Sequence, residues 1–221
     1  MKFPNAHSGV KKIFTAEVLS MISAIALLIT AVLAFAADKL IGSGAAETAA
    51  EEATGIAAAL VIFGIVGSIL MLIAFILNLA GIVSAMKDES SFKTALIFTI
   101  AGIAAAVLSS IFSKNDVVKD FTQIIVNFAE MMVAYHVVRG IVCLAVRLRD
   151  TEMVERGSKV IVYLMLAYFV PILIHFISVL FSMKEEGIVS QVLALIAAVL
   201  SLFVYFIYLG YLGRARKMLE G

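Results

Sequence analysis

The architecture is decided by residues 56–85, which read IAAALVIFGIVGSILMLIAFILNLAGIVSA. No charged side chain interrupts this stretch, and it exceeds the roughly 18 apolar residues that mark a transmembrane helix. Strands of a membrane barrel would be about 10 residues long and would alternate strictly, and this stretch does not alternate. It therefore predicts a helix that crosses a membrane.

Similar apolar segments recur along the chain. The composition agrees with a membrane protein, because 63% of the 221 residues are apolar and 15% are charged, whereas soluble domains average about 45–50% and 25%. We predict an all-α, polytopic integral membrane protein in which residues 1–221 form a single six-helix transmembrane domain. The expected spans lie at about residues 18–37, 56–85, 94–113, 121–146, 160–183 and 188–211.

Lysine and arginine predict how this bundle is oriented, because cytoplasmic loops carry an excess of both. The side that holds the N-terminus carries 12 of these cations and the opposite side carries four. We therefore expect a multi-pass protein of the cell membrane with both termini in the cytoplasm. The acidic connection 38–54 then faces outward, and we expect part of it to be helical and to extend the second span beyond the bilayer.

The beginning of the chain allows a second interpretation. Residues 1–36 combine basic residues, an apolar core and an Ala34-Phe35-Ala36 cleavage pattern, as a signal peptide does. Their apolar run is longer than the roughly 7–15 residues of such peptides, so we expect a retained helix.

The second, fourth and sixth spans end alike, with a glycine shortly before cations. This indicates either three hairpins of a common plan or the usual ending of helices that return to the cytoplasm.

Small and polar residues at helical spacing predict the faces on which the spans pack, because helices in lipid associate through close approach and interhelical hydrogen bonds. The first span offers Ser20, Ala24 and Ala31. The second offers Gly64, Gly67, Met71, Ala74, Asn78 and Gly81, and the third offers Thr99, Gly102, Ala106, Ser109 and Ser113.

Polar side chains within the spans are the candidates for function, because an ionisable group there costs roughly 2.5–3.5 kcal/mol. In the fourth span Gln123, Asn127 and Glu130 share one helical face. In the fifth span His175 follows Pro171, which removes a backbone hydrogen bond. With a rise of about 1.5 Å per residue, Glu130 and His175 reach similar depths. The candidate binding site is Asn127, Glu130, His175 and Gln191.

This cluster has two interpretations. It is a proton or cation relay or a polar binding pocket, or it is a buried hydrogen-bonded pair in which Glu130 is protonated by its apolar surroundings. We expect Arg139 to extend its side chain to the cytoplasmic interface, with an inward anion contact beside His136 as the alternative. We expect Glu17 to be interfacial and Cys143 to be a small packing residue.

Signatures of enzymes are missing from the sequence. It contains neither a His-Glu-x-x-His zinc motif nor a Walker loop, and it lacks a Gly-x-Ser-x-Gly elbow. All five aspartates lie in loops or at the edges of spans. We expect a protein that is not an enzyme and has no metal or cofactor, and the net charge of +1 does not favour nucleic acid as a partner.

In size and outline the chain resembles the substrate-binding subunits of energy-coupling-factor vitamin transporters. Those subunits meet a partner through an alanine-rich face of the first helix, to which Ala24, Ala31 and Ala34 correspond loosely, and no binding residues are carried across. We expect a membrane protein that transports or binds a small solute or ion, including a proton. The alternative is a non-catalytic scaffold or regulatory subunit. The partners to consider are the lipid bilayer, a membrane subunit and a second copy of the chain.

Overall fold

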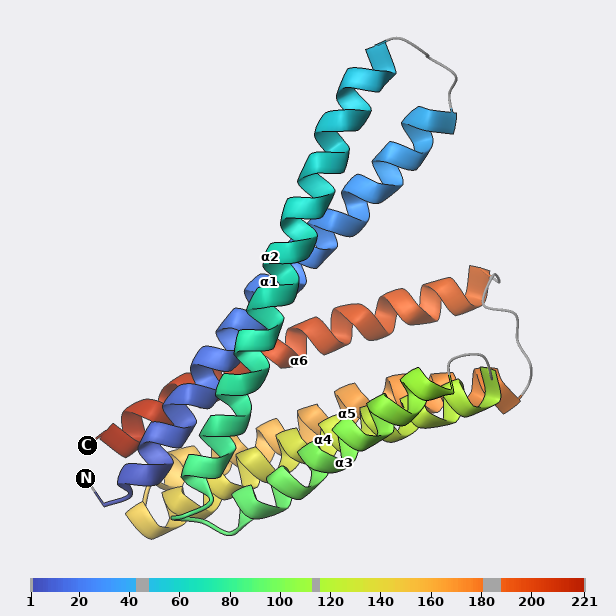
Figure 1. Ribbon diagram of the computed structural model, residues 1–221. Coiled ribbons are helices and arrows are strands. Elements are labelled where there is room, and N and C mark those ends of the chain that lie inside the picture. Colours follow the sequence, from blue (N-terminus) through green and yellow to red (C-terminus); the bar gives the residue numbers. More distant parts are fainter. Residues whose placement is uncertain (1, 43–47, 113–115, 181–187, 221) are drawn as a thin grey trace. The chain divides into compact units, whose positions relative to one another are not determined.

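The computed structural model describes residues 2–42, 48–112, 116–180 and 188–220, and this part of the chain is all-helical (Figure 1). Side chains are described outside 31–32, 34–42, 48–57, 116–117, 119–120, 171, 174–180, 188–199 and 201. The helices are α1 (Pro4–Gly42), α2 (Thr48–Ala85), α3 (Ser91–Ile111), α4 (Asp116–Leu148), α5 (Thr151–Leu180) and α6 (Ile188–Glu220).

Four of these helices are long and apolar enough to cross a membrane. In the described part of the chain the qualifying segments are Pro4–Thr30, Ala58–Ala85, Ser91–Ile111 and Phe121–Leu148. Their large apolar side chains are widely exposed, as Ile62, Leu72 and Ile111 are at 60%, 60% and 67%. Such surfaces are too apolar for a helix in water and fit contact with lipid. Membrane association is thereby supported for this all-helical chain.

The first helix begins earlier than the sequence predicted. The prediction began at residue 18 because it followed the uninterrupted apolar run, whereas α1 begins at Pro4, a residue that suits the first turn of a helix. An apolar stripe continues through this segment, because Ala6, Val10, Ile13 and Ala16 are spaced three or four apart and are all at most 1% exposed. Lys11 and Lys12 interrupt the run but not the stripe.

Part of the connection 38–54 is helical, as expected, because α1 continues to Gly42 and α2 begins at Thr48. The described chain divides into two compact units, one of residues 1–11 and 79–221 and one of residues 12–78. In the first unit α3 packs on α4, α4 on α5 and α5 on α6, and Figure 1 shows α3, α4 and α5 side by side.

Glycines allow the helices of the first unit to approach closely. A Cβ at Gly140 would lie 2.6 Å from the Phe92 ring, and a Cβ at Gly157 would lie 2.5 Å from the Tyr211 hydroxyl. A Cβ at Gly102 would lie 3.3 Å from the Ala129 Cβ, which agrees with the predicted place of Gly102 on the packing face of α3. The buried alanine beside it is Ala105 rather than the predicted Ala106.

The second unit is held by polar contacts between α1 and α2. The Ser23 hydroxyl donates to the Gly67 carbonyl over 2.7 Å, and Ser23 is 1% exposed. On α1 the prediction is wrong for Ala24, which is exposed, whereas Ser23 and Ala26 are buried. Ser20 is half-buried, and the side chain of Ala31 lies outside the described part. On α2, Gly67 and Ala74 pack as predicted, but Met71 is 59% exposed. A pattern of small residues therefore predicts which side of a helix is buried only to within about one residue position.

The corner between α4 and α5 combines two capping motifs. The amide of Asp150 donates to the Ala145 carbonyl and that of Arg149 to the Val146 carbonyl, which is the Schellman pattern. Arg149 occupies the left-handed position of this Schellman motif, with φ 62°. Glycine is the usual residue at that position, and a residue with a side chain there destabilises the fold by roughly 1 kcal/mol. The Asp150 carboxylate then accepts from the Met153 amide over 2.9 Å, so it caps α5.

Loss of this cap gives a first prediction. Asp150→Ala is expected to lower the free energy of unfolding by about 1 kcal/mol, because the Met153 amide at the start of α5 loses its acceptor. Asp150→Asn keeps an acceptor oxygen and is expected to cost less than half as much. Equilibrium unfolding in detergent micelles measures both. Equal losses in the two variants would contradict the capping role.

Candidate functional site

The predicted polar face of α4 is present in the structure. The Gln123 amide donates to the Asn127 side-chain oxygen over 3.0 Å, one helical turn apart. Glu130 follows on the same face and is exposed, and Asn127 is half-buried. All three lie in Phe121–Leu148, which is long and apolar enough to cross a membrane. The structure therefore places a hydrogen-bonded amide pair and a carboxylate along one side of this helix.

The other two predicted site residues lie outside the part of the chain whose side chains are described. His175 belongs to α5 and Gln191 to α6. The side chain of Pro171 is outside that part as well. The pairing of Glu130 with His175 and the contribution of Gln191 therefore remain predictions from the sequence.

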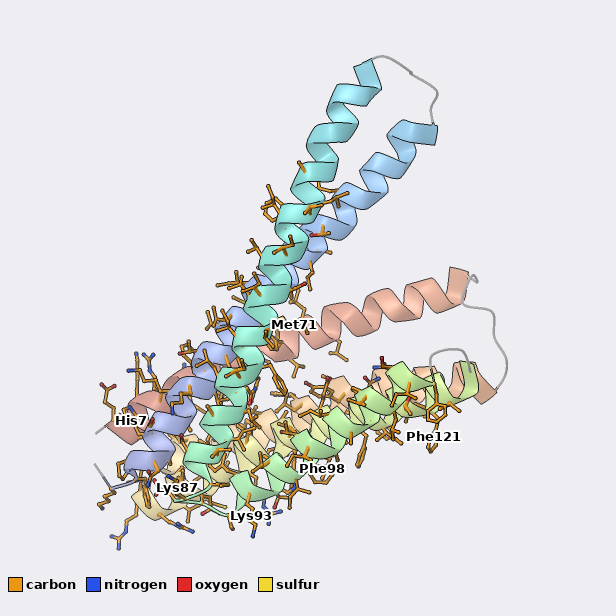
Figure 2. All side chains as sticks on the ribbon, viewed as in Figure 1. His7, Met71, Lys87, Lys93, Phe98 and Phe121 are labelled. Atoms are coloured by element: carbon orange, nitrogen blue, oxygen red, sulfur yellow. The ribbon has the colours of Figure 1, made fainter. Side chains whose placement is uncertain are left out.

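His136 lies against aromatic residues rather than in the polar face. Its ring stacks on Phe98 of α3 with centroids 5.7 Å apart and meets Tyr135 edge-on at 4.9 Å. Arg139 is exposed and donates from Nη1 to the Tyr135 hydroxyl over 3.4 Å. Phe98, labelled in Figure 2, also meets the Phe128 ring edge-on, with ring centroids 6.5 Å apart. These aromatic contacts fix how α3 and α4 meet.

A second polar pair lies between α1 and α2. The Asn78 amide donates to the Glu17 carboxylate over 3.2 Å. Both residues fall within segments that could cross a membrane. Glu17 was expected only to be interfacial, and the structure adds a hydrogen-bonding partner for it on α2. The sequence showed Asn78 as a packing residue but gave no reason to pair it with a residue 61 positions away.

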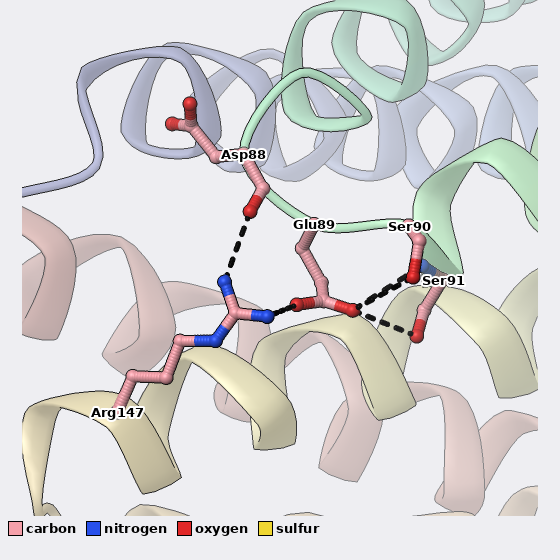
Figure 3. A network of polar contacts seen from close by, with 5 residues as sticks. All are labelled: Asp88, Glu89, Ser90, Ser91 and Arg147. Atoms are coloured by element: carbon pink, nitrogen blue, oxygen red, sulfur yellow. Dashed lines mark hydrogen bonds and ion pairs between the residues drawn. The ribbon is translucent and has the colours of Figure 1, made fainter.

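A polar network among the described residues lies where α2 turns into α3 (Figure 3). Arg147 of α4 forms a 2.6 Å ion pair with Glu89 and donates to the Asp88 carbonyl over 3.2 Å. The other Glu89 oxygen accepts from the amide and hydroxyl of Ser91, at the start of α3. Glu89 is 5% exposed, whereas the Arg147 side chain is 52% exposed.

The neighbouring acid fixes the beginning of α1. The Asp88 carboxylate accepts from the Asn5 side chain over 3.0 Å and from the Ala6 amide over 2.7 Å. Carboxylates are stabilised at helix N-termini by the free amides and by the helix dipole. Asp88 and Glu89 thus join α1, α3 and α4. The sequence placed Asp88 in a loop or at the edge of a span, and Ser90 before the apolar run is a signal for the start of α3.

The first turns of α5 carry ordinary surface ion pairs. Glu152 pairs with Arg156 over 2.5 Å and Glu155 with Lys159 over 2.7 Å, each one turn apart. The hydrogen bond and charge of Lys159 hold the pKa of the Glu155 carboxyl below its usual range. Exposed pairs of this kind contribute little to stability, so we assign them to the solvated surface.

No group of three His, Cys, Asp or Glu side chains in the described part of the chain could hold a metal ion. Comparison with protein families, with curated proteins and with solved structures found no match. The resemblance in outline to vitamin-transporter subunits therefore adds no residues to the site.

Proposed function

We propose that this protein is a multi-pass membrane protein that binds and moves a small solute or ion, coupled to a proton, along the polar face of α4. In this proposal six helices span the membrane and both termini lie in the cytoplasm. The four apolar helices support membrane insertion, and the 12-to-4 division of cations supports the orientation.

The observation that carries the proposal is the exposed carboxyl group of Glu130 within a helix able to cross the membrane. Such a group costs about 2.5–3.5 kcal/mol in hydrocarbon, so these residues are found on solute and ion pathways or paired with one another. The Gln123–Asn127 pair extends the same face with amide groups. A solute or ion on this face would meet two amides and then a carboxyl group.

The proposed roles follow from the chemistry of each side chain. Glu130 takes up and releases the proton, because among the residues of this face it alone titrates. Asn127 orients the solute by hydrogen bonds. His175 and Gln191, from α5 and α6, complete the site, with His175 as a second proton carrier, as its unperturbed pKa near 6.5 allows.

Proton movement through vesicles tests this proposal. The purified chain is reconstituted in liposomes that contain a pH-sensitive dye, and a potassium diffusion potential drives protons inward. We expect flux above that of protein-free vesicles, and we expect Glu130→Gln to reduce it about a hundredfold, the lower range for a positioned proton-transfer group. Glu155→Gln is the matched control, because it makes the same change in a surface ion pair and is expected to leave flux unaltered.

Two results would refute the relay. One is flux in the Glu130→Gln variant equal to that of the wild type, and the other is wild-type flux no greater than that of empty vesicles. Because Gln removes a charge from apolar surroundings, the variant is expected to fold at least as stably as the wild type. Thermal unfolding of the detergent-solubilised variant checks this.

A scaffold or regulatory subunit is the second candidate. It is favoured by the exposure of Glu130, because a partner subunit could cover the polar face that a single chain leaves open. Native mass spectrometry of protein gently extracted from its own membrane separates the two candidates. Stoichiometric co-purifying subunits favour the scaffold, whereas a bare chain or one with a small molecule favours the carrier.

A further inference from the structure

One end of the first unit gathers segments from across the sequence. Asn5 and Ala6 contact Asp88, which precedes α3, and Arg147 near the end of α4 contacts Asp88 and Glu89. The end of α6 joins them, because one cavity is lined by Lys2, Phe3, Leu148, Met218 and Leu219. His7, Lys87 and Lys93 lie at this end in Figure 2. The chain's beginning, its end and two turns therefore share one surface.

This surface carries an excess of positive charge. Five acids here are already engaged: Asp88 with α1, Glu89 with Arg147, Asp150 with the Met153 amide, Glu152 with Arg156 and Glu155 with Lys159. At this end, the described and exposed cations outside these contacts include Lys2, Lys87, Lys93, Arg149, Arg214 and Lys217. One exposed acid, Glu220 at the end of α6, stands against them. Most acids of this end are therefore already paired, and the six exposed cations outnumber the exposed Glu220.

The backbone of Arg149 has a conformation that is unfavourable for any residue other than glycine. Its φ of 62° places it at the left-handed position of the Schellman corner, where glycine closes the same turn without strain. Strain that persists at one residue points to a role for its side chain. The corner is closed by the backbone amides of Arg149 and Asp150 and not by the guanidinium, so we place the role of that side chain outside the turn.

The neighbouring cavity supplies an apolar surface beside these cations. Its volume is about 200 Å³, and its lining consists of Lys2 and four apolar side chains. Leu148 precedes Arg149 directly, and Met218 follows Lys217. A ligand that fits both the charge and the lining has an anionic group and an adjoining hydrocarbon part.

We propose that this end binds an anionic phospholipid of the adjoining leaflet, with its phosphate at Arg149 and Lys2 and its glycerol and first acyl carbons in the cavity. Arginine suits phosphate because its planar donors match the phosphate oxygens. Basic residues at a membrane surface attract anionic lipids, each contributing about a fivefold gain in affinity. That the leaflet is the cytoplasmic one rests on the orientation proposed above.

Thermal unfolding in zwitterionic detergent micelles doped with phosphatidylglycerol or with phosphatidylcholine tests this inference. We expect phosphatidylglycerol to raise the unfolding temperature of the wild type and phosphatidylcholine to leave it unaltered. Arg149→Gly is expected to be more stable than the wild type without lipid, because strain is relieved, and yet to bind phosphatidylglycerol about fivefold more weakly. Lys2→Gln is expected to show the same weakening.

Lys159→Gln is the matched control, because Lys159 is engaged with Glu155, and its lipid response is expected to equal that of the wild type. Arg149→Lys keeps the charge and is expected to retain most of the affinity. Native mass spectrometry of the same samples counts the phosphatidylglycerol molecules retained. Neither measurement depends on proton flux, so the two proposals fail independently.

Three results would overturn the inference. One is equal stabilisation by both lipids, and a second is unchanged phosphatidylglycerol affinity in both Arg149→Gly and Lys2→Gln. The third is protection by glycerol phosphate at the same concentration, which would show a site for a soluble anion rather than for a lipid.

Discussion

Gly9→Ala is expected to lower the stability of the fold by about 3 kcal/mol, at the upper end of the range for overpacked interiors. A Cβ at this position would lie 2.5 Å from the Gly81 carbonyl oxygen and 2.7 Å from both the backbone nitrogen and the Cβ of Ala85. Two of these atoms belong to the backbone of α2, which cannot rotate aside as a side chain can. The helices must therefore separate, and the hydrogen bonds of Asp88 to the start of α1 are strained with them.

The matched control is Gly210→Ala on α6. A Cβ there meets no atom within 4 Å, so the substitution is expected to be neutral or to stabilise by roughly 0.5–1 kcal/mol, the gain for alanine in a helix interior. Equilibrium unfolding in micelles measures both variants under one set of conditions. If both substitutions changed stability by the same amount, the close approach at Gly9 would be contradicted.

Arg147→Ala is expected to cost about 2 kcal/mol. Breaking a fully buried ion pair costs about 3–5 kcal/mol because one charge is left without compensation, and the exposure of the Arg147 side chain at 52% reduces that value through solvent screening. Glu89, at 5% exposed, would keep only the weaker contacts with Ser90 and Ser91. The loss therefore arises from the stranded carboxylate rather than from the lost attraction alone.

Glu89→Gln separates these contributions. It removes the buried charge, leaves Arg147 free to turn into water, and is expected to cost less than half as much as Arg147→Ala. The double variant is expected to be more stable than Arg147→Ala alone, since no buried charge then remains. A double-mutant cycle of unfolding free energies measures the coupling. Additive losses would show that the two side chains act independently.

The sequence predicted the helices well where the apolar signal is continuous. The second span was expected to end at residue 85, and α2 ends at Ala85. The beginning of α1 was missed because Lys11 and Lys12 break the run while the stripe of Ala6, Val10 and Ile13 continues. Gly9 lay in that missed segment, so its contact with α2 could not be anticipated.

Spacing within one helix could be predicted from the sequence, whereas contacts between helices could not. Spacing alone placed Gln123, Asn127 and Glu130 on one face of a helix, and the Gln123–Asn127 hydrogen bond confirms that the first two meet. The ion pair of Glu89 with Arg147 was missed, because spacing within a helix is fixed by its geometry whereas contacts between distant helices depend on packing. The partners proposed for Glu130 on α5 and α6 remain predictions for the same reason.

The network at the α2–α3 turn has a consequence for synthesis on the ribosome. Arg147 follows Asp88 by 59 positions, which at about 5–20 residues per second corresponds to roughly 3–12 seconds. During that interval the first two helices are complete and Asp88 can hold the start of α1, but Glu89 lacks the partner, Arg147, that it has in the folded chain. A charged Glu89 disfavours burial of the turn until the fourth helix has emerged. The growing chain is therefore expected to reach its final packing in two steps, with the emergence of Arg147 as the trigger.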